Sequence, residues 1–307
     1  MHRLLLLAAL AAVLSCPAAP KLRAQPLQDT AVLVVTAHPD DEALFAGSLY
    51  RVAQELGGRV DLALVTDGAG GYRYSNLAER IYGVELTNPD VARQYLPAIR
   101  KQELMAGGRI IGFRQYYFLD QPDTGKTTDP DSILATVWNA DFVLNRLTEI
   151  LRSNRYDFIL TSLPLSDTHG HHKAAAILAL RASQQLVDGK RPVVMGAWIS
   201  DVGDETVLTF DGLDGYPESE TISATSSFRF DKTQPLAGND RLNYKIPVNW
   251  LIAEHKSQGT MQLFVNRGDI EEYWVYHLNP PDAVERATGY FDALNNFVDS
   301  HGAPDGN

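Results

Sequence analysis

Residues 31–42 read AVLVVTAHPDDE and join a core strand to a cluster of polar side chains. The first seven of them, AVLVVTA, are almost entirely apolar and rich in β-branched side chains, which is typical of a strand buried on both faces. Strands of that kind belong to parallel sheets that helices cover on both sides. An imidazole and three carboxylates follow at once, in His38, Asp40, Asp41 and Glu42. The stretch therefore predicts a parallel α/β fold with a chemical site where its first strand ends.

The alternation of strands and helices continues beyond this stretch. Residues 41–56 have apolar side chains at helical spacing, with acids in the first turn, where the helix dipole favours them. Further strands are predicted over residues 60–66, 116–119, 157–164 and 193–198. Further helices are predicted over residues 97–112, 139–153, 246–258 and 282–298, and from the loop LSDTHGHHK to about residue 187. This order predicts a Rossmann-like α/β fold, an open, mostly parallel sheet with helices on both faces.

The C-terminal third has a different pattern. Residues 200–245 contain Gly- and Asp-rich turns and alternating stretches such as TISATSSFRF, which predict a small C-terminal β appendage. We therefore divide the chain into a signal peptide over residues 1–24, a catalytic α/β domain over 25–200 and a β-rich extension with closing helices over 201–307. The extension is expected to pack on the same domain.

The N-terminus is typical of an exported protein. Residues 4–14 form an apolar run of eleven, which is too short to span a bilayer as a helix and matches the core of a signal peptide. Cleavage after Ala24 would leave 283 residues of the 307, since 307 − 24 = 283. The alternative is a loose lipobox, Val13 to Cys16, with a lipid anchor on Cys16. Both alternatives predict a periplasmic or extracellular protein, and no other apolar run is long enough for a membrane helix.

Composition excludes several classes of protein. The formal net charge is −11 and no basic stripe is present, which argues against a nucleic-acid partner. Cys16 is the only cysteine, so no disulfide forms within the chain. The loop TDGAGG lacks the GxGxxG spacing of a dinucleotide-binding turn, and the first strand is followed by HPDDE in place of glycines.

Four unusual polar loops follow the first four predicted strands: HPDDE, DGAGG, DQPD and DTHGHH. In an open parallel sheet, ligands bind beyond the carboxyl ends of the strands. The four loops should therefore meet at one edge and form a site.

The residue types in these loops suit a metal ion. His38 and Asp41 lie three residues apart across a strand-to-helix turn and can hold one ion together, while HGHH at residues 169–172 supplies more imidazole. Two histidines, one carboxylate and a water form a catalytic zinc arrangement, in which zinc lowers the pKa of the water to about 7. A further carboxylate within reach of that water is the natural general base. Each loop also has a plainer interpretation, Asp40 as a helix cap and HGHH as a solvated loop, but their convergence favours the metal site.

AHPDDE after a first strand, with a second His-rich motif after a later strand, resembles the PIG-L/LmbE-like family of zinc-dependent de-N-acetylases. The resemblance covers about residues 31–187 well and the C-terminal third poorly. Members of this family deacetylate N-acetylglucosaminyl-phosphatidylinositol, precursors of mycothiol and bacillithiol, and some antibiotic glycosides. The resemblance implies the Rossmann-like fold and one zinc ion per chain, with other divalent metals possible.

The resemblance also implies roles for individual residues. The zinc ligands of the family map onto His38, Asp41 and His172, the general base maps onto Asp40, and the residue that stabilises the oxyanion maps onto His169.

The second motif departs from the family pattern at two positions. Gly170 replaces a proline and His171 replaces an aspartate, which leaves open whether His171 or His172 is the third ligand.

Substrate contacts are implied at two further positions. Arg100, three residues before Glu103 in IRKQEL, matches an arginine of the family, and Asp123 in QPDTG fits an aspartate that binds sugar hydroxyls, with Asp120 as the alternative. Their plainer interpretations are an ion pair on a helix face and the start of a turn. The segment EHKSQ, residues 254–258, is also similar to a segment of many relatives and is expected to pack at the rim of the site.

The favoured function is an exported zinc hydrolase that removes an acetyl group from an amino sugar or its glycoside, using a water that the zinc ion activates. The first alternative is a non-catalytic, metal-stabilised, secreted sugar-binding protein, which would have no need of Asp40 beside the ligands. A metallo-esterase or phosphoesterase is the third hypothesis, but phosphoester sites use two metals and a basic clamp, and the ligands here suffice for one ion. The sequence predicts neither the substrate nor the oligomeric state.

Overall fold

A computed structural model of the protein describes residues 27–187, 189–236 and 239–296. The predicted signal peptide and Cys16 lie outside the described residues, so export and lipidation stay predictions. Within the described ranges, no helix combines the length and the apolar character needed to cross a bilayer.

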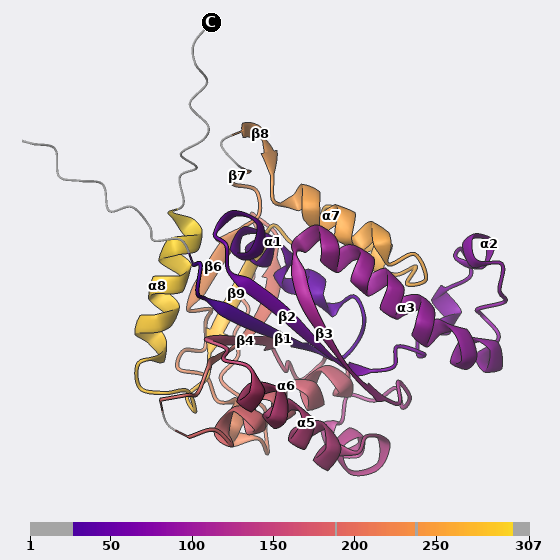
Figure 1. Cartoon of the computed structure of the whole chain (residues 1–307), viewed down its shortest axis with the longest axis horizontal. Helices are drawn as coiled ribbons and strands as arrows, with labels where there is room; N and C mark the ends of the chain where they lie inside the picture. Colours follow the sequence, from indigo (N-terminus) through magenta and orange to yellow (C-terminus); the bar gives the residue numbers. More distant parts are fainter. Residues whose placement is uncertain (1–26, 188, 237–238, 297–307) are drawn as a thin grey trace, which may run out of the picture.

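A seven-stranded sheet in the order β3-β2-β1-β4-β5-β9-β6 forms the centre of the molecule (Figure 1). Its first five members in the chain, β1 to β5, are all parallel, and β9 pairs antiparallel with both β5 and β6. The strands are β1 Ala31–Thr36, β2 Arg59–Thr66, β3 Phe113–Gln121, β4 Phe158–Ser162, β5 Val193–Ser200, β6 Phe228–Asp231 and β9 Ile270–Val275. A separate pair, β7 Pro235–Leu236 and β8 Asn239–Asn243, makes a small second sheet. The predicted Rossmann-like α/β fold is confirmed.

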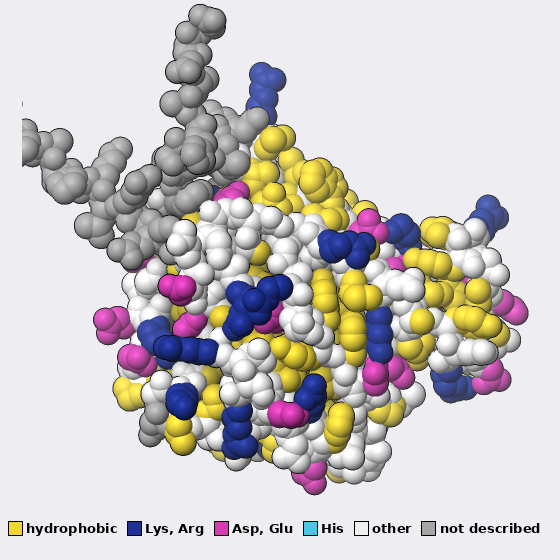
Figure 2. All heavy atoms as spheres, viewed as in Figure 1, with side chains coloured by type: hydrophobic (Ala, Val, Ile, Leu, Met, Phe, Trp, Pro, Cys, Tyr) yellow, Lys and Arg dark blue, Asp and Glu magenta, His cyan; other side chains and the backbone are white. Residues whose placement is uncertain are grey.

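Helices cover both faces of this sheet, as Figure 1 shows for α5 and α6 on one side and α1, α3 and α7 on the other. The α-helices are α1 Ala46–Tyr50, α2 Glu79–Tyr82, α3 Pro89–Ile111, α4 Pro130–Ser132, α5 Ala140–Ser153, α6 Gly170–Gln184, α7 Lys245–Glu254 and α8 Ala283–Asn295. Short 3-10 turns lie at η1 Asp41–Phe45, η3 Tyr72–Tyr74, η5 Pro217–Ser219 and η6 Met261–Phe264, and π-helical turns at η2 Arg51–Glu55 and η4 Ile133–Val137. Figure 2 shows apolar side chains gathered on the projection that carries α2, where Leu77 and Ile81 are exposed.

Strand β1 is buried on both faces, as its composition predicts. Val32 and Val34 pack into the core beneath α1, α3, α7 and α8, whereas Leu33 and Val35 pack into the core beneath α5 and α6. Successive side chains of a strand point to opposite faces, so a strand between two helical layers must be apolar at every position. This explains why the sequence around residue 33 carries no alternation.

The strand order reverses at β1, and this reversal positions the site. The chain runs from β1 outward to β2 and β3, then crosses back to place β4 on the other side of β1. A crevice opens beyond the carboxyl ends of the strands at such a switch point, and ligands bind there. The loops after β1 and β4, which carry HPDDE and HGHH, flank this point.

Helix α3 begins at Pro89, eight residues before its predicted start at residue 97. The side chain of Asn88 accepts hydrogen bonds from the backbone N–H groups of Asp90 and Val91, and Pro89 occupies the first turn. Asn followed by Pro is a strong start signal, because the amide oxygen caps the helix and proline lacks a hydrogen that would need a partner. Helix α3 then continues through Pro97.

The C-terminal region contributes more to the main sheet than its sequence suggests. The small pair β7–β8 corresponds to the predicted appendage, whereas β6 and β9 extend the main sheet. Strand β9, with the sequence IEEYWV, was not predicted, because two adjacent glutamates are unusual inside a buried strand. The last two residues of the predicted helix 282–298 lie outside the described residues.

Candidate metal centre

Two imidazole nitrogens and one carboxylate converge where β1 and β4 end. His38 Nδ1 lies 3.0 Å from His172 Nε2, and His172 Nε2 lies 3.4 Å from Asp41 Oδ1. The separation between His38 Nδ1 and Asp41 Oδ2 is 3.8 Å. Zinc binds nitrogen and oxygen ligands tetrahedrally at about 2.0–2.2 Å, which places neighbouring donor atoms about 3.3–3.5 Å apart. The chemistry and the spacing of these three donors therefore fit one divalent ion.

The end of β1 holds the Asp41 carboxylate in place. The backbone N–H groups of Ala37 and His38 donate to Asp41 Oδ2 at 3.0 and 2.8 Å. The other oxygen, Oδ1, is thereby left to face His172. Hydrogen bonds of this kind fix a carboxylate before a metal arrives, which lowers the entropy lost on binding.

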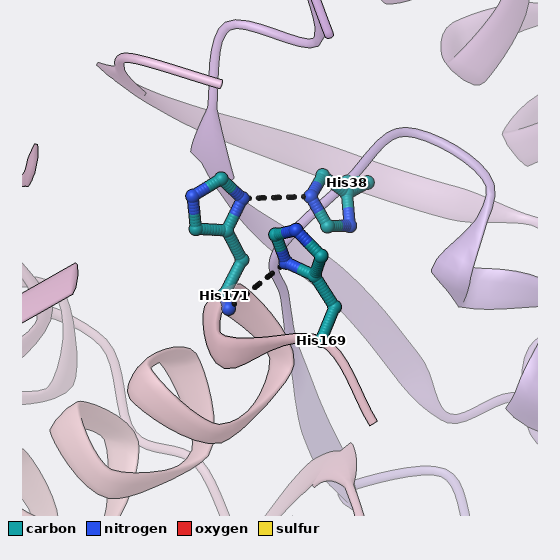
Figure 3. Close-up of side chains that lie close together, drawn as sticks. All are labelled: His38, His169 and His171. Atoms are coloured by element: carbon teal, nitrogen blue, oxygen red, sulfur yellow. Dashed lines mark hydrogen bonds between the residues drawn. The ribbon is translucent and has the colours of Figure 1, made fainter. Parts of the chain in front are cut away.

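The second nitrogen of His38 has its own partners. His171 Nε2 lies 3.0 Å from the carbonyl oxygen of Thr124, which can only accept, so that nitrogen carries the proton and His171 Nδ1 has a lone pair. His171 Nδ1 lies 3.0 Å from His38 Nε2, which is therefore the donor in the contact drawn in Figure 3. The Nδ1 atom of His38 is then free to face His172 and Asp41, as a metal ligand must. This geometry favours His172 as the third donor and His171 as the group that orients His38.

A second group of three imidazoles also shares His38. His169 and His171 offer nitrogen atoms that lie within 4.8 Å of each other and of His38. Three imidazoles can hold zinc. In this group, however, His171 is tied to Thr124 and stacks on Trp138 with ring centroids 5.1 Å apart. The first group is therefore the better candidate, since its donors face one another and include a carboxylate.

Asp123 adds a negative charge behind His38. Its Oδ1 lies 3.4 Å from His38 Nε2 and 3.5 Å from His171 Nδ1, while Oδ2 accepts the backbone N–H of Gly70 at 2.8 Å. Gly70 is required for this approach, because a β-carbon there would lie 2.6 Å from Asp123 Cγ. Burial opposes the ionised form of Asp123, but the two imidazoles outweigh it and hold its pKa well below the usual range. A carboxylate behind a metal-binding histidine is a recurring arrangement that raises the basicity of the ligand.

Three nearby carboxylates change the pKa of His38. Burial disfavours its imidazolium form, but the charges of Asp123, Asp41 and Asp40 outweigh burial and raise the pKa of His38 to about 9. A divalent ion would replace the ring proton on Nδ1, so metal binding releases a proton.

Asp40 stands beside the donors in an unusual backbone conformation. Its φ is 137° and its ψ is −21°, a region that residues with a side chain rarely adopt and that costs about 1–3 kcal/mol. Within the part of the chain that the structure describes, no hydrogen bond engages its carboxylate. Burial, followed by the charge of Asp41, raises the pKa of Asp40 to about 7, and a bound cation would lower this value. Asp40 therefore has a free carboxylate and a pKa in the range of a general base.

His169 is a neutral donor on the other side of the group. Its Nδ1 accepts the backbone N–H of His171 at 3.2 Å, which places the ring proton on Nε2 (Figure 3). Burial, followed by the neighbouring imidazoles, lowers the pKa of His169 to about 4. At neutral pH this side chain offers one N–H group.

Arg100 lies beneath the loop after β2 and is buried at 3% exposure. Its Nη1 donates to the carbonyl oxygens of Gly68 and Gly70 at 2.6 and 2.5 Å, and its Nε donates to Ser257 Oγ at 3.2 Å. These contacts fix the loop that holds Asp123. The predicted substrate contact of Arg100 stays a prediction, as does that of Asp123.

Asp120, the alternative to Asp123, points to a different neighbour. It forms an ion pair with Lys101, and its side chain is 54% exposed. It does not join the histidine group.

Two contacts beneath the site were not predicted from the sequence. Glu42 Oε1 lies 2.6 Å from His255 Nε2, and both side chains have no exposed surface. Gln258 Nε2 donates to the carbonyl oxygen of Pro39. The segment EHKSQ, expected at the rim, thus reaches the underside of the first loop. The only signal in the sequence was the similarity of this segment to relatives.

Comparison with known proteins found relatives for the part of the chain that carries this site. Residues 33–183 match the family model PIG-L, described as GlcNAc-PI de-N-acetylase. The chain is 29% identical over 163 residues to the probable N-acetyl-alpha-D-glucosaminyl L-malate deacetylase 2 of Bacillus cereus, which covers 53% of this chain and 65% of that relative. Residues 33–183, about half of the chain, are thus similar to the PIG-L family of de-N-acetylases, and the chain spans less than two thirds of the length of the Bacillus cereus relative.

Solved structures with the same fold differ in chemistry. GalB, the 4-carboxy-2-hydroxymuconate hydratase of Pseudomonas putida KT2440, has a TM-score of 0.52 at 14% identity, over 80% of this chain and 95% of that chain. The zinc-inhibited form of teicoplanin deacetylase Orf2 has a TM-score of 0.50 at 16% identity, over 80% of this chain and 98% of that chain. At these identities the likeness concerns the fold alone. Because a hydratase and a deacetylase share it, the reaction has to be argued from the site.

Proposed function

We propose that this protein is an exported, metal-dependent hydrolase that removes the acetyl group from the nitrogen of an amino sugar or its glycoside. The observation that carries the proposal is the convergence of His38 Nδ1, His172 Nε2 and the Asp41 carboxylate at 3.0, 3.4 and 3.8 Å, with Asp40 beside them. The match of residues 33–183 to the PIG-L family model and the similarity to the Bacillus cereus relative, whose name specifies an N-acetylglucosaminyl substrate, support the amide and the amino sugar. The apolar run at residues 4–14 supports export.

The donor set supports one zinc ion per chain, held by His38, Asp41 and His172. Other divalent ions are compatible with two imidazoles and a carboxylate. A zinc ion bound there polarises the amide carbonyl and lowers the pKa of a water molecule to about 7.

Side chains of the protein transfer the proton, stabilise the oxyanion and contact the substrate. Asp40 accepts a proton from the attacking water and returns it to the amine as the carbon–nitrogen bond breaks, giving acetate and the free amino sugar. The Nε2–H of His169 donates to the carbonyl oxygen, and this hydrogen bond strengthens as that oxygen becomes negatively charged. We also assign a contact with sugar hydroxyls to Asp123, on the loop after β3, and a substrate contact to Arg100, on α3 beneath the loop after β2.

The test is metal content together with acetate release from N-acetylglucosamine and a panel of its glycosides, for the wild type and Asp40→Asn. We expect about one zinc per chain in both proteins and about 10²–10⁴-fold slower turnover in the variant, since a general base contributes about that much. An active Asp40→Asn protein contradicts the assigned base.

Two other results would redirect the proposal. Zinc without acetate from any glycoside would favour the metal-stabilised sugar-binding protein. A protein that binds no metal would overturn the metal site.

A further inference from the structure

The loop that carries the proposed base is held from below by a segment more than 200 residues further along the chain. Gln258 donates to the carbonyl oxygen of Pro39, and His255 reaches Glu42. Both groups come from the turn that follows α7, so one short segment contacts the loop at two points.

Glu42 connects His255 to Asp40 through its two carboxylate oxygens. Its Oε1 lies 2.6 Å from His255 Nε2, and its Oε2 accepts the backbone N–H of Asp40 at 2.9 Å. The two oxygens thus join a buried imidazole to the peptide group of the residue with φ 137°. Neither Glu42 nor His255 has any exposed surface, so neither is available to a substrate.

We infer that Glu42 and His255 are positioning residues that hold Asp40 in its strained conformation and so aim its carboxylate at the reacting water. The inference rests on the proposed function, because it takes Asp40 as the base. A strained residue keeps its conformation only where its surroundings dictate it, and Glu42 supplies the hydrogen bond to the peptide group at issue. His255 in turn fixes the carboxylate of Glu42, so that Oε2 stays aligned with Asp40.

A second buried carboxylate gives a matched control. Glu271 also has no exposed surface and accepts the backbone N–H groups of Gly47 and Ser48 at 2.7 and 3.1 Å. Gly47 and Ser48 lie in α1, beyond η1, whereas Asp40 directly precedes η1. Glu271→Gln therefore perturbs α1 without touching the loop.

The experiment compares His255→Leu, which removes the donor, with His255→Gln, whose amide nitrogen can replace Nε2. We expect kcat to fall about 10²-fold in His255→Leu, because small misplacement of a reacting group has effects of that size, and to stay within about fivefold of wild type in His255→Gln. KM and zinc content should stay within about twofold in both, and kcat should also stay within about twofold in Glu271→Gln. Should His255→Leu not fold, Glu42→Gln tests the same contact, since it keeps the volume and removes one acceptor oxygen.

A double-mutant cycle with Asp40→Asn separates positioning from general damage. If His255 acts through Asp40, His255→Leu has no further effect on kcat in the Asp40→Asn background. An equal loss in both backgrounds, or an equal loss in Glu271→Gln, overturns the inference.

Hydrogen exchange provides a measurement that does not depend on turnover. The peptide covering residues 38–45 should exchange faster in His255→Leu than in wild type, whereas Glu271→Gln should affect residues 46–50 instead. If the wild type releases no acetate from any substrate, the proposed function fails, and selective exchange at residues 38–45 still supports the positioning contact. Unchanged exchange there overturns the contact whatever the activity.

Discussion

Glu42 and Glu271 are both fully buried carboxylates, and both accept hydrogen bonds from backbone N–H groups within residues 40–48. The two glutamates have different basic neighbours. Glu42 meets the imidazole of His255, whereas Glu271 lies beside Lys232, whose charge favours its ionised form although burial raises its pKa overall. The two carboxylates also hold different backbones, a strained peptide at the site in one case and an ordinary helical turn in the other.

Replacing Glu42 and replacing Glu271 should therefore have different consequences, although both side chains contact the backbone within residues 40–48. A buried charge pair adds little net stability, but removal of one partner leaves an uncompensated charge and is strongly destabilising. At Glu271 that consequence is all we expect, since the helix there reaches no reacting group. At Glu42 we expect an effect on turnover as well, because the held residue is the proposed base.

The largest effect on stability is expected for Glu271→Ala. The change leaves Lys232, which is 1% exposed, without its buried counter-charge, and the free energy of unfolding should fall by about 3–5 kcal/mol. Urea unfolding measures this loss, and kcat of the folded protein should be unchanged. A fall in kcat as large as that of His255→Leu would erase the distinction between the two carboxylates.

Zinc affinity distinguishes a metal ligand from a residue that orients one. His172→Ala removes a proposed ligand and should weaken zinc binding by on the order of 10²–10³-fold, because about 10–16 kcal/mol is shared among some four ligands in structural zinc sites. His171→Phe keeps an aromatic ring beside Trp138 and removes the hydrogen bonds to Thr124 and to His38 that orient His38, so we expect a loss of about 10–100-fold.

Competition with a chelator measures both affinities, and Glu271→Gln serves as the control with unchanged affinity. A larger loss in His171→Phe than in His172→Ala would exchange the roles of the two histidines.

The smallest effect tests the close packing around Glu271. A β-carbon at Gly47 would lie 2.7 Å from Lys232 Cγ and 2.8 Å from Glu271 Oε1, so Gly47→Ala should lower the free energy of unfolding by about 1–3 kcal/mol. Gly289, inside α8, has no atom within 4 Å of its would-be β-carbon, and Gly289→Ala should raise stability by up to about 1 kcal/mol. Thermal unfolding of the two variants measures the contrast, and destabilisation by Gly289→Ala would show that helix propensity does not explain it.

Much of the fold could be predicted from local patterns. AVLVVTA, followed by helical spacing over residues 41–56, placed β1 and the helical stretch after it. Strand β9 was missed because Glu271 and Glu272 break an apolar run, and their partners Lys232 and Arg229 lie about 40 residues away. A buried charge is tolerated only where a distant partner reaches it, and no local pattern shows that partner.

The candidate site divides in the same way. The sequence by itself determined the residue types at the ends of β1 and β4, and a parallel sheet brings those ends to one edge, so His38, Asp41 and the HGHH loop were bound to meet. Tertiary structure alone decided that His172 faces Asp41 while His171 turns to Thr124, because ring direction depends on the packing of α6. It alone also brought His255 beneath Glu42, across 213 positions of the chain. Contacts at that separation follow from how whole elements pack, whereas strand, helix and loop composition follow from neighbours along the chain.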